Sequence, residues 1–341
     1  MKSKVDKGGY MDIESKKRIE ELRNQGYTYY EISQELGISQ DSIRNYFYRE
    51  RRKNDVVEET EKFVIRIPES IICQQEPKEY VPSGNEEAVL QLSDIHYGAL
   101  IESQIATYNE EIATARLTYL TDRVIGILKT FHPTVKKIHI LFEGDIIDGE
   151  NIYPDQHYYS ITISRQLENV IAPLSYLLSQ FMQHFAVECY AVSGNHARTS
   201  RNSRPSDSYD HVVYTTMARL FPQLSWHISD DWWQKIKILN TTLLLMHGDD
   251  ITNSSEPEAL VERAVLRYRK MMGDFDYLTI GHFHHHWETD NVIANGNVCG
   301  ATFFSQRRIM VATPPSQNLF LISPKHHKTL IRQLMLDEQN G

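Results

Sequence analysis

The stretch "KKIHILFEGDIIDG" (residues 136–149) joins an apolar run to two aspartates and two glycines. Short apolar runs of this kind are typical of buried strands, and Asp145 and Asp148 follow where the run ends. Four other apolar runs also end in polar residues, in chain order "LSDIH", "VSGNH", "LLMHGDD" and "TIGHFH". Ligands of open α/β sheets bind beyond the carboxyl ends of the strands. We therefore expect these five run ends to converge on one site.

The rest of the chain favours a layered α/β fold. Strand-like runs alternate with helical patterns near residues 107–131, 160–183, 208–220 and 256–272, and such alternation is typical of α/β cores. The later runs "KIKIL", "VIANGNV" and "NLFLI" indicate a second sheet.

The composition excludes several classes of protein. Hydrophobic residues make up 41% and charged residues 24% of the 341 positions, as in globular proteins. No apolar run approaches the roughly 18 residues that a membrane span needs, and the N-terminal segment lacks the apolar core of a signal peptide. Cys73, Cys189 and Cys299 form neither a disulfide framework nor a cysteine-based zinc pattern. We expect a folded cytoplasmic protein with reduced cysteines and no membrane partner.

Residues 1–53 predict a separate helical domain, followed by a linker over residues 54–87. Three helical patterns occur in it, "DIESKKRIEELRNQG", "TYYEISQELG" and "SQDSIRNYFYRERR". Thr28 and Glu31 form a capping box, and Ser39 is placed to cap the third helix. The charge also differs, because this domain has 12 Lys and Arg against 9 Asp and Glu, whereas the remainder has 24 against 36.

Two helices joined by a tight turn containing glycine are typical of a helix-turn-helix. The sequence "YTYYEISQELGISQDSIRNYF" resembles the helix-turn-helix of resolvase-like and sigma-region-4-like bacterial DNA-binding domains. This resemblance implies a set of residues that face DNA: Gln40, Asp41, Arg44, Asn45 and Tyr48, with Arg49, Arg51, Arg52 and Lys53 at phosphates. The alternative is a three-helix packing or dimerisation module with a solvated basic end, which would support a homodimer.

The polar run ends carry the residue types of a metal site. Residues two apart on an extended segment point the same way, so we expect Asp94 with His96, and His282 with His284, each to reach one metal region. A glycine precedes a candidate ligand in three of the runs, where it permits a sharp turn. Carboxylates mixed with imidazoles favour Mn²⁺, Fe or Zn²⁺ over Ca²⁺.

The order D-x-H, G-D-x-x-D, G-N-H, H and G-H-x-H resembles the calcineurin-like metallophosphoesterase superfamily, which includes Ser/Thr phosphatases, purple acid phosphatases, cyclic-nucleotide phosphodiesterases and the Mre11/SbcD nucleases. The resemblance spans residues 88 to about 290. It implies a two-sheet α/β/β/α sandwich over residues 88–341 that holds two divalent metals, with Mn²⁺ favoured and Fe or Zn²⁺ as alternatives. The implied ligands are Asp94, His96 and His284 for one metal, Asn195, His247 and His282 for the other, and Asp145 as the bridge.

The same resemblance implies the catalytic roles. A hydroxide that bridges the two metals attacks the phosphorus atom, His196 protonates the leaving oxygen, and Asp148 supports the site. Many members have an acidic residue after the motif histidine, but here Ala197 and then Arg198 follow. This arrangement is similar to the G-N-H-x-R variants of phage and bacterial members, in which the arginine assists phosphate binding; the alternative is a charge that only solubilises the loop. His285 and His286 have no counterpart, and we expect both to be bystanders.

Together the two resemblances favour a phosphodiesterase that cleaves DNA, delivered to its substrate by the helix-turn-helix. One alternative is a phosphomonoesterase or nucleotide phosphoesterase whose N-terminal module only localises or dimerises it, since the ligand motifs are shared by enzymes for monoesters and diesters. Another is a DNA-binding or packaging-associated factor in which the phosphoesterase fold is a scaffold. All seven ligand positions carry competent residues, which disfavours the scaffold.

Overall fold

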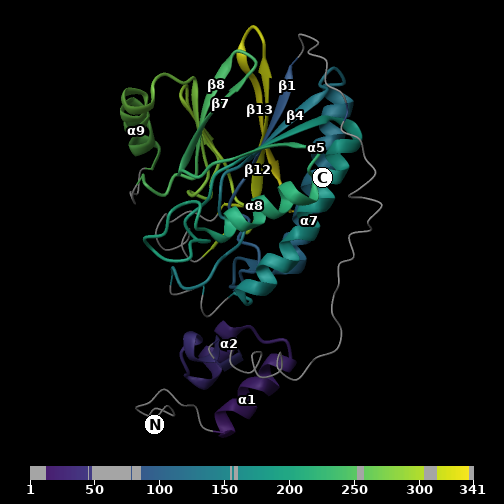
Figure 1. The fold of residues 1–341 in the computed structure, drawn as a ribbon. Helices are drawn as coiled ribbons and strands as arrows, with labels where there is room; N and C mark the ends of the chain where they lie inside the picture. The colour runs from purple at the N-terminus through teal and green to yellow at the C-terminus, as the bar shows by residue number, and fades with distance from the viewer. Residues whose placement is uncertain are drawn as a thin grey trace.

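The computed structural model describes residues 13–44, 46–47, 78, 86–153, 156, 160–251, 257–302 and 313–337. Within them a small helical group near the N-terminus is followed by a larger body of sheets and helices (Figure 1). The predicted linker, residues 54–87, lies outside the described residues except for positions 78, 86 and 87.

The first sheet has six strands in the order β13-β12-β1-β4-β5-β6. Strands β1, β4, β5 and β6 are parallel, whereas β12 and β13 are antiparallel to their neighbours. The carboxyl ends of the four parallel strands therefore meet at one edge. The bounds are β1 Glu87–Leu92, β4 Lys137–Phe142, β5 Ala186–Ala191, β6 Ser225–Ile228, β12 Ser316–Ser323 and β13 His327–Met335.

The second sheet has five strands in the order β10-β11-β9-β8-β7. Strands β8, β9 and β11 are parallel, and β7 and β10 pair antiparallel at the two edges. The bounds are β7 Trp233–Ile238, β8 Thr241–Met246, β9 Tyr277–Ile280, β10 Trp287–Glu288 and β11 Val292–Ala294. A two-stranded hairpin, β2 Ile101–Glu102 and β3 Thr107–Tyr108, follows β1.

Alternation along the strands stacks the layers. Successive strand residues point to opposite faces, so Leu90 of β1 packs on the helix side while Val89 packs in the core between the sheets. In β8, Leu245 faces the first sheet and Leu244 faces a helix. Helices α5 Glu110–Phe131, α7 Ile163–His184 and α8 Tyr209–Leu220 cover the first sheet, and α9 Pro257–Met272 covers the second (Figure 1). The predicted layered α/β core with a second sheet is confirmed.

The N-terminal group contains α1 Ile13–Asn24, α2 Tyr29–Leu36 and further helical residues at 40–44 and 46–47. They pack around a small apolar core that includes Leu22, Ile32 and Ile43. The predicted capping box is present, since Thr28 N donates to Glu31 Oε2 at 2.8 Å and Glu31 N donates to Thr28 Oγ1 at 3.3 Å. None of the helices that the structure describes combines the length and apolarity needed to cross a membrane.

The helical group touches the larger body at the β2–β3 hairpin. Arg23 Nη2 lies 2.6 Å from Glu102 Oε1, and Arg44 Nη2 donates to the Glu102 carbonyl oxygen at 3.1 Å. The hairpin follows the carboxyl end of β1 closely in the chain. The contact therefore lies on the edge of the sheet where the polar run ends were expected to meet.

Candidate metal centre

The seven residues predicted as metal ligands lie in loops that directly follow five strands. The first sheet contributes through β1, β4 and β5, and the second through β8 and β9. Six of the seven residues are at most 4% exposed. We call Asp94, His96 and His284 the Asp94 group, and Asn195, His247 and His282 the Asn195 group.

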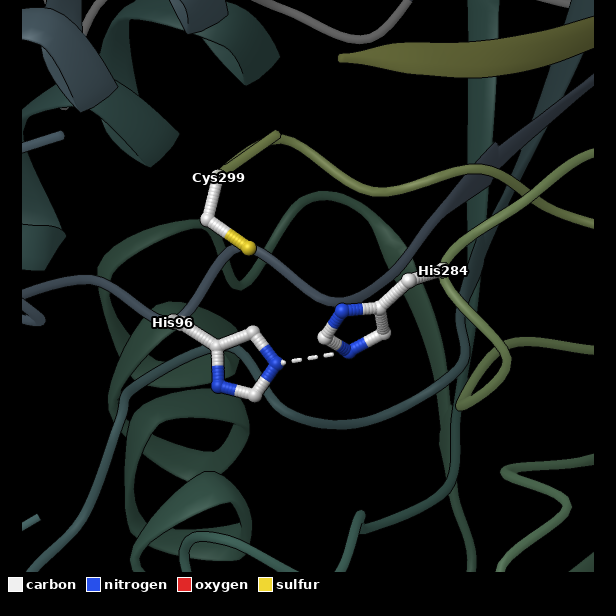
Figure 2. Close-up of side chains that lie close together, drawn as sticks. All are labelled: His96, His284 and Cys299. Atoms are coloured by element: carbon white, nitrogen blue, oxygen red, sulfur yellow. Dashed lines mark hydrogen bonds between the residues drawn. The ribbon is translucent and has the colours of Figure 1, made fainter. Parts of the chain in front are cut away.

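The donor atoms of the Asp94 group face one another. The Nε2 atoms of His96 and His284 are 3.2 Å apart (Figure 2). Asp94 Oδ1 lies 3.4 Å from His284 Nε2 and 4.0 Å from His96 Nε2. Atoms bound to one cation at about 2.0 to 2.2 Å lie about 3 to 3.5 Å from each other. The spacing of this group therefore fits a divalent cation.

The Asn195 group has the same character. Asn195 Oδ1 lies 2.7 Å from His247 Nε2 and 3.1 Å from His282 Nδ1. Between the two groups stands Asp145, whose Oδ2 atom is 3.2 Å from His247 Nε2 and 3.8 Å from His96 Nε2. One carboxylate oxygen thus reaches both groups, and the arrangement fits a pair of divalent cations that share a ligand.

The backbone at five of these residues is left-handed. The φ angles are 51° at Asp94, 48° at His96, 52° at Asp145, 66° at His282 and 62° at His284. Such angles are uncommon outside glycine and cost about 1 to 3 kcal/mol each. Our expectation that the D-x-H and H-x-H segments have an extended backbone is therefore wrong. Because the chain turns at each position, the H-x-H histidines point to different groups, which is the division that the family resemblance implies.

Two of the glycines in these loops leave room for the neighbouring loop. Gly144 has a φ of 86°, and a Cβ atom on it would collide with the backbone of Gly194. A Cβ atom on Gly194 would in turn collide with the carboxylate of Asp145. The loops after β4 and β5 therefore approach each other more closely than any side chain permits.

Asp210, in the first turn of α8, holds these two loops together. Its buried carboxylate accepts the backbone N–H groups of Asp145 at 2.9 Å, Gly194 at 3.0 Å and Ile146 at 3.1 Å. Burial, together with the charge of Asp145, raises the pKa of Asp210 to about 7. Asp210 was not identified from the sequence, because it lies outside every motif and these partners are backbone atoms.

Asp148 orients two histidines at once. Its Oδ1 atom is 3.3 Å from Nδ1 of His96 and 3.3 Å from Nδ1 of His196, and Ser160 Oγ donates to its other oxygen. Burial alone would raise the pKa of Asp148, but the hydrogen bonds from His196 and His96 hold that pKa far below its usual value. Burial would lower the pKa of His196, but the charges of Asp145 and Asp148 raise it. The side chain of His196 keeps 24% exposure, so it can reach a bound ligand.

Hydrogen bonds from outside the two groups fix the direction of the donor atoms. His247 Nδ1 donates to the Glu143 carbonyl oxygen at 2.7 Å, which turns Nε2 toward the site. Asn195 Nδ2 donates to the Tyr153 hydroxyl at 2.6 Å, which leaves its amide oxygen for the histidines. The Tyr153 ring also packs against His196, with 4.7 Å between centroids. Tyr153 was not identified from the sequence, which has no motif there.

The protonation states of two of the histidines, His96 and His282, suit metal binding. Burial, aided by the charge on His247, lowers the pKa of His282 to about 4, and burial lowers that of His96. Both imidazoles are therefore neutral near pH 7, the form that binds metal. Burial would lower the pKa of His247 too, but Asp145 and Asp94 raise it to about 10. A cation at the Asn195 group would compete with that proton.

Two other residues of the motif loops, Arg198 and His285, each lie against a carboxylate. Arg198 Nη2 forms an ion pair with Asp249 Oδ2 at 2.6 Å, so its guanidinium already has a carboxylate partner. His285 Nε2 lies 3.3 Å from Glu258 Oε1, outside both groups.

Only part of the expected DNA-facing set falls in the described residues. Gln40 is partly exposed and Asp41 is exposed. Arg44, in contrast, is 5% exposed and donates to the Glu102 carbonyl oxygen in the hairpin. The expectation that Arg44 is exposed and faces DNA is therefore wrong. The other members of the set lie outside the described residues: Asn45, Tyr48, Arg49, Arg51, Arg52 and Lys53.

A scan against protein-family models gives no match for this chain, and a search of curated proteins gives none. Solved structures do align with it. Vps29 from Entamoeba histolytica complexed with Zn²⁺ is 14% identical with a TM-score of 0.33, covering 73% of this chain and 99% of that chain. Vps29 from Cryptosporidium parvum is also 14% identical, with a TM-score of 0.33 and coverages of 74% and 99%.

A third aligned structure is a conserved uncharacterised protein of Streptococcus pneumoniae TIGR4, described as a predicted phosphoesterase. It is 9% identical with a TM-score of 0.30, covering 73% of this chain and 98% of that chain. TM-scores this low carry no weight for the function of this chain.

Proposed function

We propose that this chain is a dinuclear-metal-dependent phosphodiesterase of the calcineurin-like type that cleaves DNA. The observation that carries the proposal is the position of Asp145, whose single Oδ2 atom lies between the Asp94 group and the Asn195 group. The sequence also supports the proposal through its ordered set of five motifs. The family resemblance divides their ligands into two sets, and the distances in the structure agree with that division.

The donor set defines what the centre would hold. The Asp94 group and the Asn195 group would each take one divalent cation, with Asp145 shared, and their oxygen and imidazole donors suit Mn²⁺, with Fe and Zn²⁺ as alternatives. When bound, two such cations polarise the phosphoryl group and lower the pKa of an attacking water.

The remaining chemistry belongs to His196. Its imidazole stands beside the Asp94 group, with 4.4 Å between the His196 and His96 ring centroids, and it is reachable from solvent. The carboxylates of Asp145 and Asp148 raise its pKa and so favour the protonated ring. Asp148 holds Nδ1, which leaves the other ring nitrogen free to give its proton to the leaving oxygen. His196 is thus the general acid and Asp148 its positioning residue.

DNA as the substrate is supported by the N-terminal module. Its described helices, their capping box and the turn at Gly37 agree with the helix-turn-helix resemblance. The module touches the β2–β3 hairpin, which follows the loop of Asp94 and His96 in the chain. A duplex held by the module would therefore lie on the side of the body that carries the metal centre.

The test is a hydrolysis assay on metal-free protein reloaded with Mn²⁺. The substrates are single- and double-stranded DNA, bis(p-nitrophenyl) phosphate and p-nitrophenyl phosphate. We expect DNA and the diester to be cleaved, and His196→Ala to lower kcat by about 10² to 10⁴ while the metal content stays unchanged. Unchanged cleavage by this variant would refute the acid role. Turnover of the monoester with DNA left intact would refute the nuclease.

A second candidate is a phosphomonoesterase or nucleotide phosphoesterase whose N-terminal module only localises or dimerises it. The burial of Arg44 against the hairpin favours this candidate, because a residue expected to read DNA instead joins the module to the body. The same assay separates the two functions. Gel-shift titration with DNA adds a second measurement, in which absence of binding at low salt favours the monoesterase.

A further inference from the structure

Cys299 lies beside the Asp94 group, although no motif contains it. It follows β11 in the chain and is 1% exposed. Its Sγ atom and nitrogen atoms of His96 and His284 all lie within 4.8 Å of one another. Figure 2 shows the sulfur pointing from its own loop toward the space between the two imidazole rings. Three soft or borderline donors from three separate loops thus surround one point.

The loop of Cys299 is tied to the loops that carry the Asp94 group. Val298 N donates to the Asp94 carbonyl oxygen at 3.0 Å. Asn297 Nδ2 donates to the His284 carbonyl oxygen at 2.7 Å. Among the described residues, the hydrogen bonds of the thiol are long, at 3.5 Å to Asn297 Oδ1 and 3.9 Å to the Gly300 carbonyl oxygen. The residues just before the thiol are therefore anchored, while the hydrogen bonds of the thiol itself are weak.

A second anchor comes from helix α5. Arg116 Nη1 donates to the Val298 carbonyl oxygen at 2.7 Å, and its Nη2 atom pairs with Asp337 Oδ1 at 2.7 Å. Arg116 is 9% exposed, so this is a buried cationic anchor on the backbone next to Cys299. Val298 is thus held by Asp94 at its N–H group and by Arg116 at its carbonyl oxygen, and the neighbouring thiol of Cys299 is buried.

We infer that Cys299 is an additional ligand of the cation held by Asp94, His96 and His284. The inference rests on the proposed metal centre and concerns which metal it takes. Zinc binds thiolate sulfur at about 2.3 Å and imidazole nitrogen at about 2.0 to 2.1 Å, so sulfur and nitrogen on one cation lie about 3.5 to 4.4 Å apart. A small rotation of the side chain covers the difference. As the sulfur–metal bond forms, the S–H proton is released to solvent.

The consequence is a centre with two unlike halves. A thiolate is a soft ligand that selects Zn²⁺, Co²⁺ or Fe²⁺ over Mn²⁺ and Mg²⁺, whereas the Asn195 group offers only an amide oxygen, imidazoles and the shared carboxylate. The Asp94 group therefore prefers Zn²⁺ or Fe²⁺, and Mn²⁺ competes better at the Asn195 group.

The chain contains its own control, since Cys189 is a second buried cysteine. It lies in β5, is 0% exposed and packs in the core between the first sheet and its helices. The experiment uses full-length protein carrying Cys73→Ser, so that the remaining thiols are Cys189 and Cys299. On this background Cys299→Ala and Cys299→Ser are compared with Cys189→Ala, and thermal unfolding checks that each variant is folded.

Metal-free protein is titrated with Co²⁺ and followed by absorption. A cobalt–thiolate bond adds a near-ultraviolet charge-transfer band to the visible d–d bands that any cobalt site shows. We expect the band in the parent and in Cys189→Ala, and its loss in both Cys299 variants with the d–d bands retained. Competition between Zn²⁺ and Mn²⁺ gives a second measurement, in which Cys299→Ala lowers Zn²⁺ affinity at least about tenfold and leaves Mn²⁺ affinity unchanged.

The outcomes separate this inference from the proposed function. Visible d–d bands without the charge-transfer band in the parent would overturn the role of Cys299 and leave the metal centre standing. A charge-transfer band that persists in Cys299→Ala would overturn it as well. No uptake of cobalt by any variant would overturn the metal centre, and the role of Cys299 with it.

Discussion

The six-stranded sheet carries a cluster of acidic residues and histidines at each of its ends. At the amino ends of the parallel strands, His139 Nε2 lies 2.6 Å from Glu87 Oε2. Beside them, Glu188 is paired with Lys137 at 2.6 Å and with His227 at 2.8 Å. These side chains stand on the strands themselves, and each carboxylate has a partner that can carry positive charge.

The cluster at the carboxyl ends is built differently. Five of its seven predicted ligands have a left-handed backbone, and candidate metal-binding atoms lie 2.7 to 4.0 Å from one another. Within the part of the chain that the structure describes, neither Asp94 nor Asp145 pairs with a lysine or arginine. A buried carboxylate needs a positive partner. The comparison teaches that histidine and carboxylate together do not define a metal site. At the carboxyl end the buried carboxylates face histidines, whose positive charge depends on a proton that a metal cation can replace.

The largest expected effect follows from removing the shared carboxylate at the carboxyl end. Asp145→Asn takes a negative ligand from both donor groups, so we expect metal affinity to fall by more than about 100-fold, beyond the effect of losing an outer partner. Metal content after dialysis measures it. Glu188→Gln at the amino end is the control and should leave metal content unchanged. An equal loss of metal from both variants would contradict the assignment of metal binding to the carboxyl ends of the strands.

The next effect concerns the backbone of the carboxyl-end loops. Asp210→Ala leaves several buried N–H groups without an acceptor, so we expect the free energy of unfolding to fall by about 3 kcal/mol or more, along with metal affinity. Urea unfolding measures the change in the free energy of unfolding, and Asp207→Ala, at an exposed neighbouring aspartate, is the control. Asp210→Asn should be intermediate, because its amide keeps one acceptor oxygen. Stability equal to that of the control would show that these loops do not depend on Asp210.

A smaller effect tests how the carboxyl-end cluster sets the proton on His196. Asp148→Asn removes a charge that raises the pKa of His196, so the protonated imidazole should be lost at lower pH. We expect kcat to fall about 10- to 100-fold. The alkaline limb of its pH profile should also move to lower pH. A fall in kcat with an unmoved profile would assign Asp148 to structure alone.

The smallest effect belongs to the amino end. Burial would raise the pKa of Glu188, but the Lys137 ammonium lowers it from 4.5 to about 2. The resulting stability is present above pH 4.5 and is lost as pH falls toward 2. Glu188→Gln should therefore cost about 1 kcal/mol of unfolding free energy at pH 7, after allowance for solvent screening, and less as the pH is lowered. Urea unfolding from pH 7 to pH 3 checks this. A difference that does not change with pH would contradict it.

Much of the fold was predictable because it follows from local pattern. The alternation of apolar residues decides which side of a strand faces the helices, as at Leu90 and Val89, and this repeats along both sheets. The capping box of Thr28 and Glu31 was predictable for the same reason, since both partners lie within one turn. The types of metal-binding side chain in the loops after the strands could likewise be identified directly from the sequence.

The parts that could not be predicted depend on contacts between distant segments. Asp210 meets Asp145 from 65 positions away, and Arg44 meets Glu102 from 58 positions away. In the second case a side chain with every local sign of exposure is covered by the hairpin. The left-handed turns at His282 and His284 also escaped prediction, because the alternation of the sequence there is that of an extended strand.

By itself the sequence determined the layers and the chemistry of the loops, because strand alternation and donor type are properties of neighbouring residues. The tertiary structure decided how closely the donors meet, which goes beyond the grouping that the family resemblance implies. Five loops from two sheets converge at one edge, Asp145 falls between two groups, and Cys299 is brought beside His96 and His284. The physical reason is that such distances depend on how the two sheets stack and where each loop turns, which no local pattern encodes.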